Sequence, residues 1–273
     1  MTINCKGQII DLSTPKIMGI LNITPNSFYD GGKYSSKNNA ILQVEKMLKE
    51  GATFIDIGAY SSKPNAEFVS EEEELIRIIP IVKYILKEFP ETLLSIDTFR
   101  SSVAQECINN GAALINDISA GSLDEKMMEV IASNNIPYIM MHLRGTPQTM
   151  QSQTNYEHLI NEILTYFSDK ISKARSLGIS DIIIDPGFGF AKTTDQNYEL
   201  LSNLELFKIL ELPILAGVSR KSMIYKTLNI NPEEALNGTT ILNTIAVTKG
   251  ATILRVHDVK EAIECVKLYK KLG

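Results

Sequence analysis

Eight short runs of apolar residues recur along the chain, separated by longer segments of mixed polarity. The runs are continuous and rich in Ile and Leu, whereas strands with one exposed face alternate apolar and polar residues. Continuous runs are typical of a parallel sheet that is covered by helices on both faces. The predicted strands are 17–23, 54–58, 93–97, 113–118, 138–142, 182–185, 214–218 and 253–256.

The segments between these strands carry helix signals. Ser70 followed by Glu73 has the spacing of a capping box. Four further stretches (38–50, 101–110, 154–177 and 232–249) each end at a glycine, namely Gly51, Gly111, Gly178 and Gly250. Eight strand–helix repeats predict parallel strands with right-handed crossovers that close into an α/β fold, the (β/α)8 TIM barrel, as a single domain over 1–273. The first twelve residues, with Gly7 between two apolar stretches, favour a short hairpin that caps the barrel bottom.

Composition narrows the class of protein. The chain has 273 residues, is 44% hydrophobic and 22% charged, and carries a net charge of −5. No global basic field attracts nucleic acid or a membrane surface, so neither is an expected partner. Three scattered cysteines fit a reducing cytoplasm, and neither a signal peptide nor a membrane-spanning apolar run is recognisable. We therefore expect a cytoplasmic protein.

Polar side chains occupy the predicted end of every strand. Catalytic groups of such barrels come from these ends and the loops that follow them. The residues concerned are Asn22, Ser61, Ser62, Lys63, Asp97, Asn116, Asp117, His142, Asp185, Ser219, Arg220, Lys221, Arg255 and His257. Each one alone has a structural explanation, such as a helix cap for Asp97, local bonding for Asp117 or a barrel-wall position for His142. The whole set does not, because burying it unpaired would cost a few kcal/mol per group. A polar ligand would satisfy it.

The chemistry of these residues differs by position. Asp97, Asn116 and Asp185 offer acceptors and an amide that suit an amidine-like edge, such as the 2-amino-4-oxo edge of a pterin. Arg255 and His257 lie two residues apart on one strand and therefore face the same way. With Asn22 on the adjacent strand they make a phosphate-sized anion site, where Asn22 also suits Mg²⁺ as a neutral ligand.

Seven segments of the chain, in order, resemble those of the dihydropteroate synthase family, almost from end to end. They are Met-Gly-Ile-Leu-Asn-Ile-Thr-Pro-Asn-Ser-Phe at 18–28, Ser-Ile-Asp-Thr at 95–98, Ile-Asn-Asp-Ile-Ser at 115–119, Met-His at 141–142, Asp-Pro-Gly-Phe-Gly-Phe at 185–190, Gly-Val-Ser-Arg-Lys at 217–221 and Leu-Arg-Val-His at 254–257. The resemblance implies a transferase of folate synthesis. Such an enzyme joins 4-aminobenzoate to 6-hydroxymethyl-7,8-dihydropterin diphosphate, and the diphosphate leaves before the aryl amine attacks.

The resemblance also implies a role for each matching residue. The catalytic set would be Asn22, Asp97, Asp185, Lys221, Arg255 and His257. Pterin would be held by Asp97, Asn116, Asp185 and Lys221, and the diphosphate with its Mg²⁺ by Asn22, Arg255 and His257, with Asn22 as the metal ligand. Aminobenzoate would be held by Phe28, Ser62, Lys63, Pro64, Phe190 and Ser219. Members of the family usually form homodimers through late helices.

The second loop departs from the family pattern. The family commonly has Glu-Ser-Thr-Arg-Pro-Gly where this chain reads Tyr60-Ser-Ser-Lys-Pro-Asn65. Lys63 replaces a planar bidentate donor with a point charge. Ala191 also stands where Gly is usual. These changes bear on aminobenzoate affinity and sulfonamide sensitivity, and they leave the pterin and diphosphate positions intact.

Three other interpretations stay open at this point. A methyltetrahydrofolate-dependent corrinoid methyltransferase domain would share the pterin-holding residues, but it would not need Asn22, Arg255 and His257. A non-catalytic pterin-binding paralogue would bind without turnover. An unrelated barrel aldolase would use Lys221 as a Schiff base.

Overall fold

Eight parallel strands form the sheet predicted from the apolar runs, in a computed structural model that describes residues 1–23, 33–60 and 69–272. The strands are β3 (Lys16–Asn22), β4 (Phe54–Gly58), β5 (Leu93–Asp97), β6 (Leu114–Asp117), β7 (Tyr138–Met141), β8 (Ile182–Asp185), β9 (Leu215–Ala216) and β10 (Ile253–Val256). They follow the order β8-β7-β6-β5-β4-β3-β10-β9, and a parallel bridge between Ile184 and Ile214 joins β8 to the β9 side. The (β/α)8 barrel is therefore the observed fold.

Strand β9 is shorter than the predicted 214–218. Pro213 has no N–H to give to a ladder, although its carbonyl accepts from Ile184 N at 3.0 Å. At the other end, Lys221 N donates to Val218 O at 3.2 Å, so the chain is already turning there. Only Leu215 and Ala216 pair with β10.

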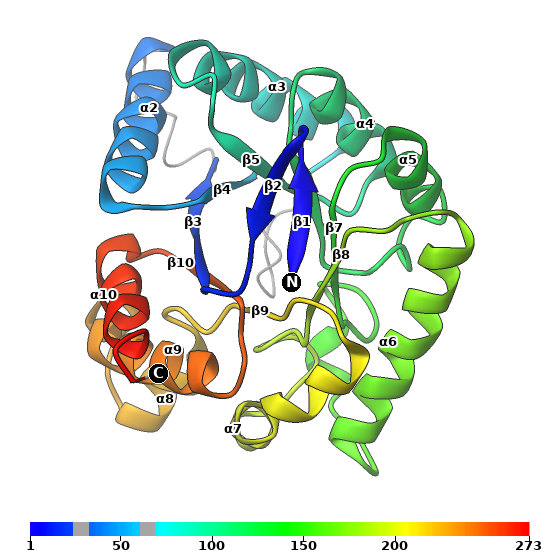
Figure 1. Ribbon diagram of the computed structural model, residues 1–273, viewed down its shortest axis with the longest axis vertical. Coiled ribbons are helices and arrows are strands. Elements are labelled where there is room, and N and C mark those ends of the chain that lie inside the picture. The colour runs from blue at the N-terminus through cyan, green and yellow to red at the C-terminus, as the bar shows by residue number, and fades with distance from the viewer. Residues whose placement is uncertain (24–32, 61–68, 273) are drawn as a thin grey trace.

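Helices surround the sheet (Figure 1). Their bounds are α2 (Lys33–Glu50), α3 (Glu71–Glu88), α4 (Ser101–Asn109), α5 (Met127–Asn134), α6 (Leu159–Ser176), α7 (Thr194–Ser202), α8 (Ser222–Leu228), α9 (Leu236–Thr248) and α10 (Val259–Tyr269). The Ser70 side chain caps α3 by accepting from Glu73 N at 3.2 Å, as its spacing predicts. All four predicted terminal glycines have φ between 89° and 106°, which a residue with a Cβ rarely adopts. The helix expected over 232–249 is divided into a 3-10 turn, η3 (Pro232–Glu234), and α9.

The expected hairpin is present as β1 (Thr2–Cys5) and β2 (Gln8–Asp11), joined through Lys6 and Gly7 at positive φ. It crosses the middle of the ring of strands in Figure 1. One face of the hairpin packs on residues from the first half of the barrel strands, forming a separate apolar cluster. That cluster comprises Ile3, Cys5, Ile10, Leu12, Met18, Phe54, Leu93, Ala113, Leu114, Ile139, Ile183, Leu215 and Ile253. The bottom of the barrel is thus plugged, and the strand C-termini lie at the other end.

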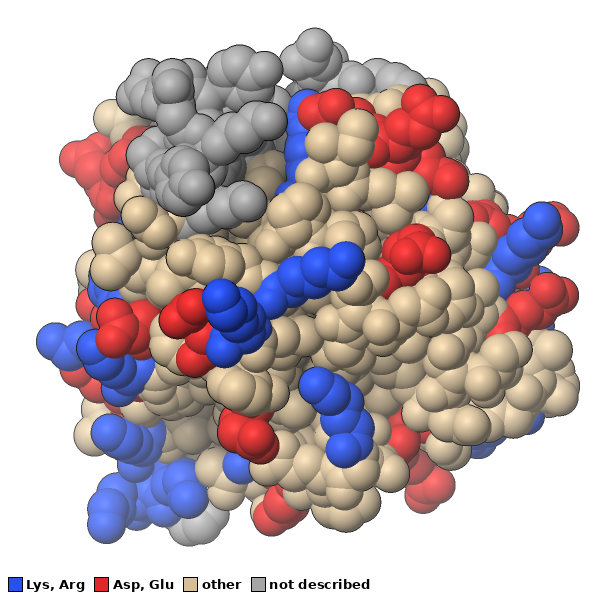
Figure 2. Space-filling model, turned by 90° about the horizontal axis from the view of Figure 1, so that it is seen from above, with Lys and Arg blue, Asp and Glu red and all other residues tan. Residues whose placement is uncertain are grey.

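On the face seen in Figure 2, acidic and basic side chains are interspersed over a larger area of other residues. Within the described ranges, no helix combines the length and apolar character that crossing a membrane requires.

Candidate active site at the strand C-termini

Arg255 on β10 joins two carboxylates that come from different strands. Its Nε donates to Asp56 Oδ2 at 2.6 Å, and its Nη2 donates to Asp97 Oδ2 at 2.8 Å. The side chains of Asp56 and Asp97 are 0% and 14% exposed, and that of Arg255 is 19% exposed. Asn116 on β6 adds a bond from Nδ2 to Asp56 Oδ2 at 3.1 Å. Four polar side chains from β4, β5, β6 and β10 therefore form one connected network inside the upper barrel.

Asp56 was not among the residues predicted for the site. It lies inside the run Phe-Ile-Asp-Ile-Gly, whereas the residues predicted for the site lie at or near strand ends. A lone carboxylate within a buried strand is itself a signal, because such a group needs a cation or several donors. The Oδ1 atom of Asp56 has no hydrogen-bond partner among the described residues, so this carboxylate retains an acceptor for a ligand.

Burial and charge act in opposite directions on this network. Burial raises the pKa of Asp97 to about 7; the Arg255 cation lowers it and the Asp56 carboxylate raises it. The pKa of Arg255 is raised above its ordinary value because two carboxylates outweigh the effect of burial. Asp97 therefore changes charge near neutrality, while Arg255 stays a cation.

The loop that follows β8 brings a second group of site residues together. Asp185 is buried and its Oδ1 accepts from Gly187 N at 2.8 Å. The Lys221 ammonium donates to Phe188 O and lies 4.9 Å from the centre of the Phe190 ring. Burial raises the pKa of Asp185, which Lys221 lowers, and burial lowers the pKa of Lys221 to about 8. Asp185, Lys221 and Phe190 thus share one corner of the strand-end face.

Backbone geometry fixes the shape of this loop. Gly187 has φ +76°, and a Cβ there would lie 2.3 Å from His142 O, so any side chain is excluded. Ala191 has φ +49°, a left-handed conformation that favours glycine. The loop therefore depends on glycine at 187 and tolerates alanine, with some strain, at 191.

Buried Lys192, which was not among the residues predicted for the site, binds the backbone of the same loop. Its ammonium donates to Gly187 O at 3.0 Å and Phe190 O at 3.1 Å, and lies 3.1 Å from His142 Nδ1. Burial lowers the pKa of Lys192 to about 7 and that of His142 to about 2, so the imidazole stays neutral and can accept the third N–H. His142 is accordingly a buried wall residue with a satisfied ring nitrogen, one of the two interpretations considered for it.

The residues assigned to the anion site are more loosely arranged. Ser219 Oγ lies 3.0 Å from His257 Nδ1 and accepts from His257 N at 3.2 Å. Asn22 ends β3 with an exposed side chain that makes no hydrogen bond to a described residue. Arg255 donates through Nε to Asp56 and through Nη2 to Asp97, so these two nitrogens are engaged in the carboxylate network.

Two other strand-end residues have structural roles. Asp117 accepts from Ser119 N, Ser119 Oγ, Gly121 N and Tyr138 Oη at 2.6–2.8 Å, which confirms the local bonding expected of it. Arg220 makes a two-bond pair with Asp258, with both distances 2.9 Å.

Four residues predicted for aminobenzoate, namely Phe28, Ser62, Lys63 and Pro64, lie outside the described residues.

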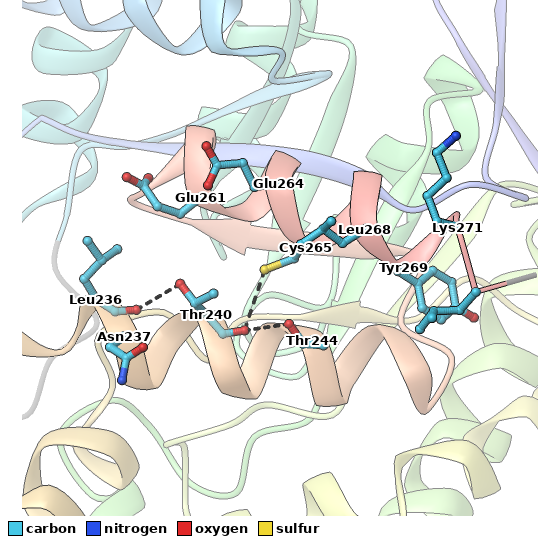
Figure 3. A pocket seen from close by; sticks show the side chains of 11 residues that line it. Leu236, Asn237, Thr240, Thr244, Glu261, Glu264, Cys265, Leu268, Tyr269 and Lys271 are labelled. Carbon is cyan, nitrogen blue, oxygen red and sulfur yellow. Dashed lines mark hydrogen bonds between the residues drawn. The ribbon is translucent and has the colours of Figure 1, made fainter.

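A different hollow, of about 620 Å³, lies between α9 and α10 (Figure 3). Leu236, Thr240 and Thr244 line it from α9, and Cys265 and Leu268 line it from α10. The Thr240 and Thr244 hydroxyls and the Cys265 thiol all donate to α9 carbonyls, so these three polar groups of its lining are engaged locally. The strand-end face, with its connected charges, is therefore the better candidate for chemistry.

Comparisons with known proteins agree with this placement. Residues 18–257 match the family model described as "Pterin binding enzyme". The dihydropteroate synthase of Escherichia coli strain K12 is 42% identical over 270 residues, covering 98% of this chain and 95% of that protein.

Solved structures give the same result. A Yersinia pestis dihydropteroate synthase in complex with a sulfonamide drug superposes with a TM-score of 0.92 at 41% identity, covering 100% of this chain and 99% of that one. A Xanthomonas albilineans dihydropteroate synthase with 4-aminobenzoic acid also gives 0.92, at 33% identity and coverage of 99% and 97%. The match spans the barrel and every described residue of the polar strand-end face, and the chain therefore belongs to the dihydropteroate synthase family, the transferases of folate biosynthesis.

Proposed function

We propose that this protein joins 6-hydroxymethyl-7,8-dihydropterin diphosphate to 4-aminobenzoate and releases diphosphate and 7,8-dihydropteroate. The observation that carries the proposal is the convergence of Asp56, Asp97, Asn116 and Arg255 with the nearby Asp185 and Lys221 at the strand C-termini. A flat heterocycle with several N–H donors and one carbonyl matches this mixture of acceptors and cations.

The carboxylates would bind the amino-pyrimidine edge of the pterin. Asp185 has one oxygen engaged with Gly187 N, which leaves acceptor capacity for ring N–H groups. The Asn116 amide donates to Asp56, and its carbonyl oxygen remains an acceptor. Lys221, whose ammonium lies near Asp185, is placed to donate to the pterin carbonyl. Each of these groups has hydrogen-bonding capacity left over, and the substrate would satisfy that capacity.

Asn22 fits the part of a magnesium ligand. Its side chain is exposed at the end of β3 and has no hydrogen-bond partner among the described residues. Those residues contain no group of three or more His, Cys, Asp or Glu that could hold a metal. Mg²⁺ keeps most of its waters and leans on substrate phosphates, so one neutral carboxamide beside the diphosphate suits it. When bound there, Mg²⁺ would neutralise charge on the leaving diphosphate.

The reaction breaks the bond between the pterin methylene carbon and the diphosphate oxygen, and the electron pair leaves with the oxygen. His257 would stabilise the negative charge that grows on this oxygen, and Arg255 would contribute through Nη1, the nitrogen that donates to neither Asp56 nor Asp97. Asp97 and Asp185 place negative charge beside the ring system that becomes cationic. The aminobenzoate nitrogen then bonds to the methylene carbon and releases one proton to solvent, so none of these carboxylates needs to act as a general base.

Phe190 and Ser219 supply the described part of the aminobenzoate position. The Phe190 ring is half-buried and faces the Lys221 ammonium, and the Ser219 hydroxyl lies beside His257. An aromatic face next to a hydroxyl donor suits a benzoate ring and its carboxylate.

Release of diphosphate tests the proposal. With Mg²⁺ and the dihydropterin substrate, diphosphate release that requires 4-aminobenzoate is expected, and chromatography of the product should reveal 7,8-dihydropteroate. The synthase assignment fails if release stays at background under these conditions. Tight pterin binding without release would instead identify a non-catalytic paralogue.

We also propose that the protein is a cytoplasmic homodimer that associates through its late helices. Several large apolar side chains are exposed there, namely Leu228, Ile241, Ile245, Leu268 and Leu272. Cys5, Cys107 and Cys265 are all free and buried, as suits a reducing compartment. Light scattering should give twice the chain mass, and Ile241→Glu should reduce it to that of a monomer.

A further inference from the structure

The Asp97 carboxylate is held by a donor on each of its two oxygens. Arg255 Nη2 donates to Oδ2 at 2.8 Å, and the Tyr60 hydroxyl donates to Oδ1 at 3.0 Å. Arg255 comes from β10, and Tyr60 follows the end of β4 by two residues. Two donors from different elements fix the plane of the carboxylate, and each oxygen keeps acceptor capacity for a ligand.

The ring of Tyr60 is itself fixed by packing. It meets the Phe99 ring edge to face, with centroids 5.2 Å apart and an interplanar angle of 88°. Phe99 in turn lies 4.9 Å from the Arg100 guanidinium. Such aromatic pairs contribute about 0.5 to 1.5 kcal/mol beyond their area. Packing of the half-buried ring against Phe99 therefore holds the Tyr60 hydroxyl next to Asp97.

The donor is a property of this chain's own residue. A Tyr stands here where the second loop of the resembling family commonly begins with Glu. An ionised Glu would add an acceptor beside Asp97, whereas the Tyr hydroxyl supplies an O–H donor.

We propose that Tyr60 is a positioning residue for the pterin: its hydroxyl orients the Asp97 carboxylate toward the N–H edge of the heterocycle. This inference rests on the proposed function, because it assigns Asp97 to the pterin. Tyr60 acts through Asp97, so its loss should alter pterin affinity and leave the aminobenzoate site unchanged.

The charges around Asp97 set the pH dependence of this effect. Among the described residues, the groups that act on it are Arg255 and Tyr60, which lower its pKa, and Asp56 and Glu74, which raise it; Lys221 also interacts with it. The ionised carboxylate accepts charge-assisted N–H bonds at both oxygens, whereas protonation turns one oxygen into an O–H donor, so pterin affinity should fall as pH drops through about 7. Removing the Tyr60 donor raises the pKa of Asp97 further, which moves this decline to higher pH.

Tyr60→Phe, which retains the ring and its contact with Phe99, is the decisive variant. Tyr198→Phe is the matched control, because it removes a hydroxyl bond of 2.8 Å to Met223 O between α7 and α8. The affinity for 6-hydroxymethylpterin is measured by calorimetry from pH 5.5 to 8.5, and KM is measured for both substrates. For Tyr60→Phe we expect about 10-fold weaker pterin binding at pH 7 and a decline shifted upward by about one pH unit. KM for aminobenzoate should stay unchanged, as should the thermal midpoint at pH 5.5, where Asp97 is protonated with or without the Tyr60 hydroxyl, and Tyr198→Phe should bind pterin normally.

The outcomes separate this inference from the function on which it rests. If the unchanged chain neither binds 6-hydroxymethylpterin nor turns over, the proposed function fails and this inference fails with it. If the unchanged chain binds and turns over while Tyr60→Phe has the same affinity and pH profile, the positioning role alone is overturned. A purely structural role would instead lower the thermal midpoint at pH 5.5 as well, and Tyr60→Leu, which also loses the Phe99 contact, would then lower that midpoint further than Tyr60→Phe without any further loss of pterin affinity.

Discussion

The two ends of the barrel use the same strands for opposite purposes. At the bottom, hairpin residues such as Ile3 and Leu12 close a cluster that contains only apolar side chains. At the top, Arg255 pairs with fully buried Asp56 and with Asp97, whose side chain is 14% exposed. Strand β8 shows the change within four residues, since Ile183 belongs to the bottom cluster and Asp185 to the polar face.

This difference indicates where the free energy of folding comes from. The bottom buries apolar surface, at roughly 25 cal/mol per Å². The top keeps carboxylates away from water, and burial raises the pKa values of Asp97 and Asp185 above those of exposed groups. A raised pKa in the folded state means that the native protein binds more protons than the unfolded chain, so these groups lower stability as pH rises. Burial of apolar surface at the bottom therefore offsets the free energy that burial of carboxylates costs at the top.

Removal of Arg255, the cation at the centre of the top, should cause the largest loss of stability. Arg255→Met leaves Asp56 and Asp97 buried without their common partner, which typically costs about 3 to 5 kcal/mol of unfolding free energy. Loss of the cation also raises the pKa of Asp97 further above 7. The variant should therefore be least stable at pH 8 and recover as pH falls toward 5.5 and the carboxylate becomes protonated.

Urea denaturation at these two pH values measures the effect of Arg255→Met. Arg175 on α6 is exposed, so Arg175→Met is the control, and its free energy of unfolding should match that of the unchanged chain at both pH values. Equal losses at pH 5.5 and pH 8 would contradict the assignment of Asp97 as the responsive group.

Two aspartates, Asp181 just before β8 and Asp185 at its end, allow a sharper comparison of the bottom with the top. Asp185→Asn retains an acceptor for Gly187 N but removes the negative charge that would bind the pterin N–H groups. Charge-assisted hydrogen bonds are worth about 1.5 to 3 kcal/mol, so pterin affinity should fall about 100-fold, with little change in stability. Asp181 lies just before the start of β8, and among the described residues its side chain accepts a 3.3 Å bond from Asn4 N at the bottom, so Asp181→Asn removes a charge far from the polar face. Calorimetry with 6-hydroxymethylpterin should distinguish the two, and a comparable loss of affinity in both variants would refute the division of roles.

The fold was predictable from sequence because its signals are local. Strands such as 54–58 and 182–185 were placed to the residue, since each apolar run ends at a Gly or an Asp. Terminal glycines and the Ser70 cap identified helix ends for the same reason. Among the strands, β9 departs most from its prediction, because Pro213 and an early turn shorten the ladder in a way that an apolar run does not reveal.

The candidate site was only partly predictable. The residues at strand ends were found, because the barrel brings those ends together. Asp56 was missed within an apolar run, and Lys192 was missed beyond the loop it supports. The pairing of Arg255 with Asp56 joins residues 199 positions apart, and it depends on a long side chain that crosses the barrel interior. Spacing along a strand predicts which face a residue occupies, but it does not predict how far a side chain reaches.

The smallest expected effect is confined to the bottom and tests whether the two ends are independent. Ile3→Ala removes a buried aliphatic side chain from the hairpin plug and should cost about 2 kcal/mol, the lower end for such truncations because the hairpin can settle into the space. Thermal unfolding should register this loss, while kcat and both KM values should match those of the unchanged chain. Ile9→Ala is the control, since Ile9 lies on the same hairpin with an exposed side chain. If Ile3→Ala altered pterin affinity, the plug would be transmitting strain along the strands, and the separation of a stabilising bottom from a functional top would be wrong.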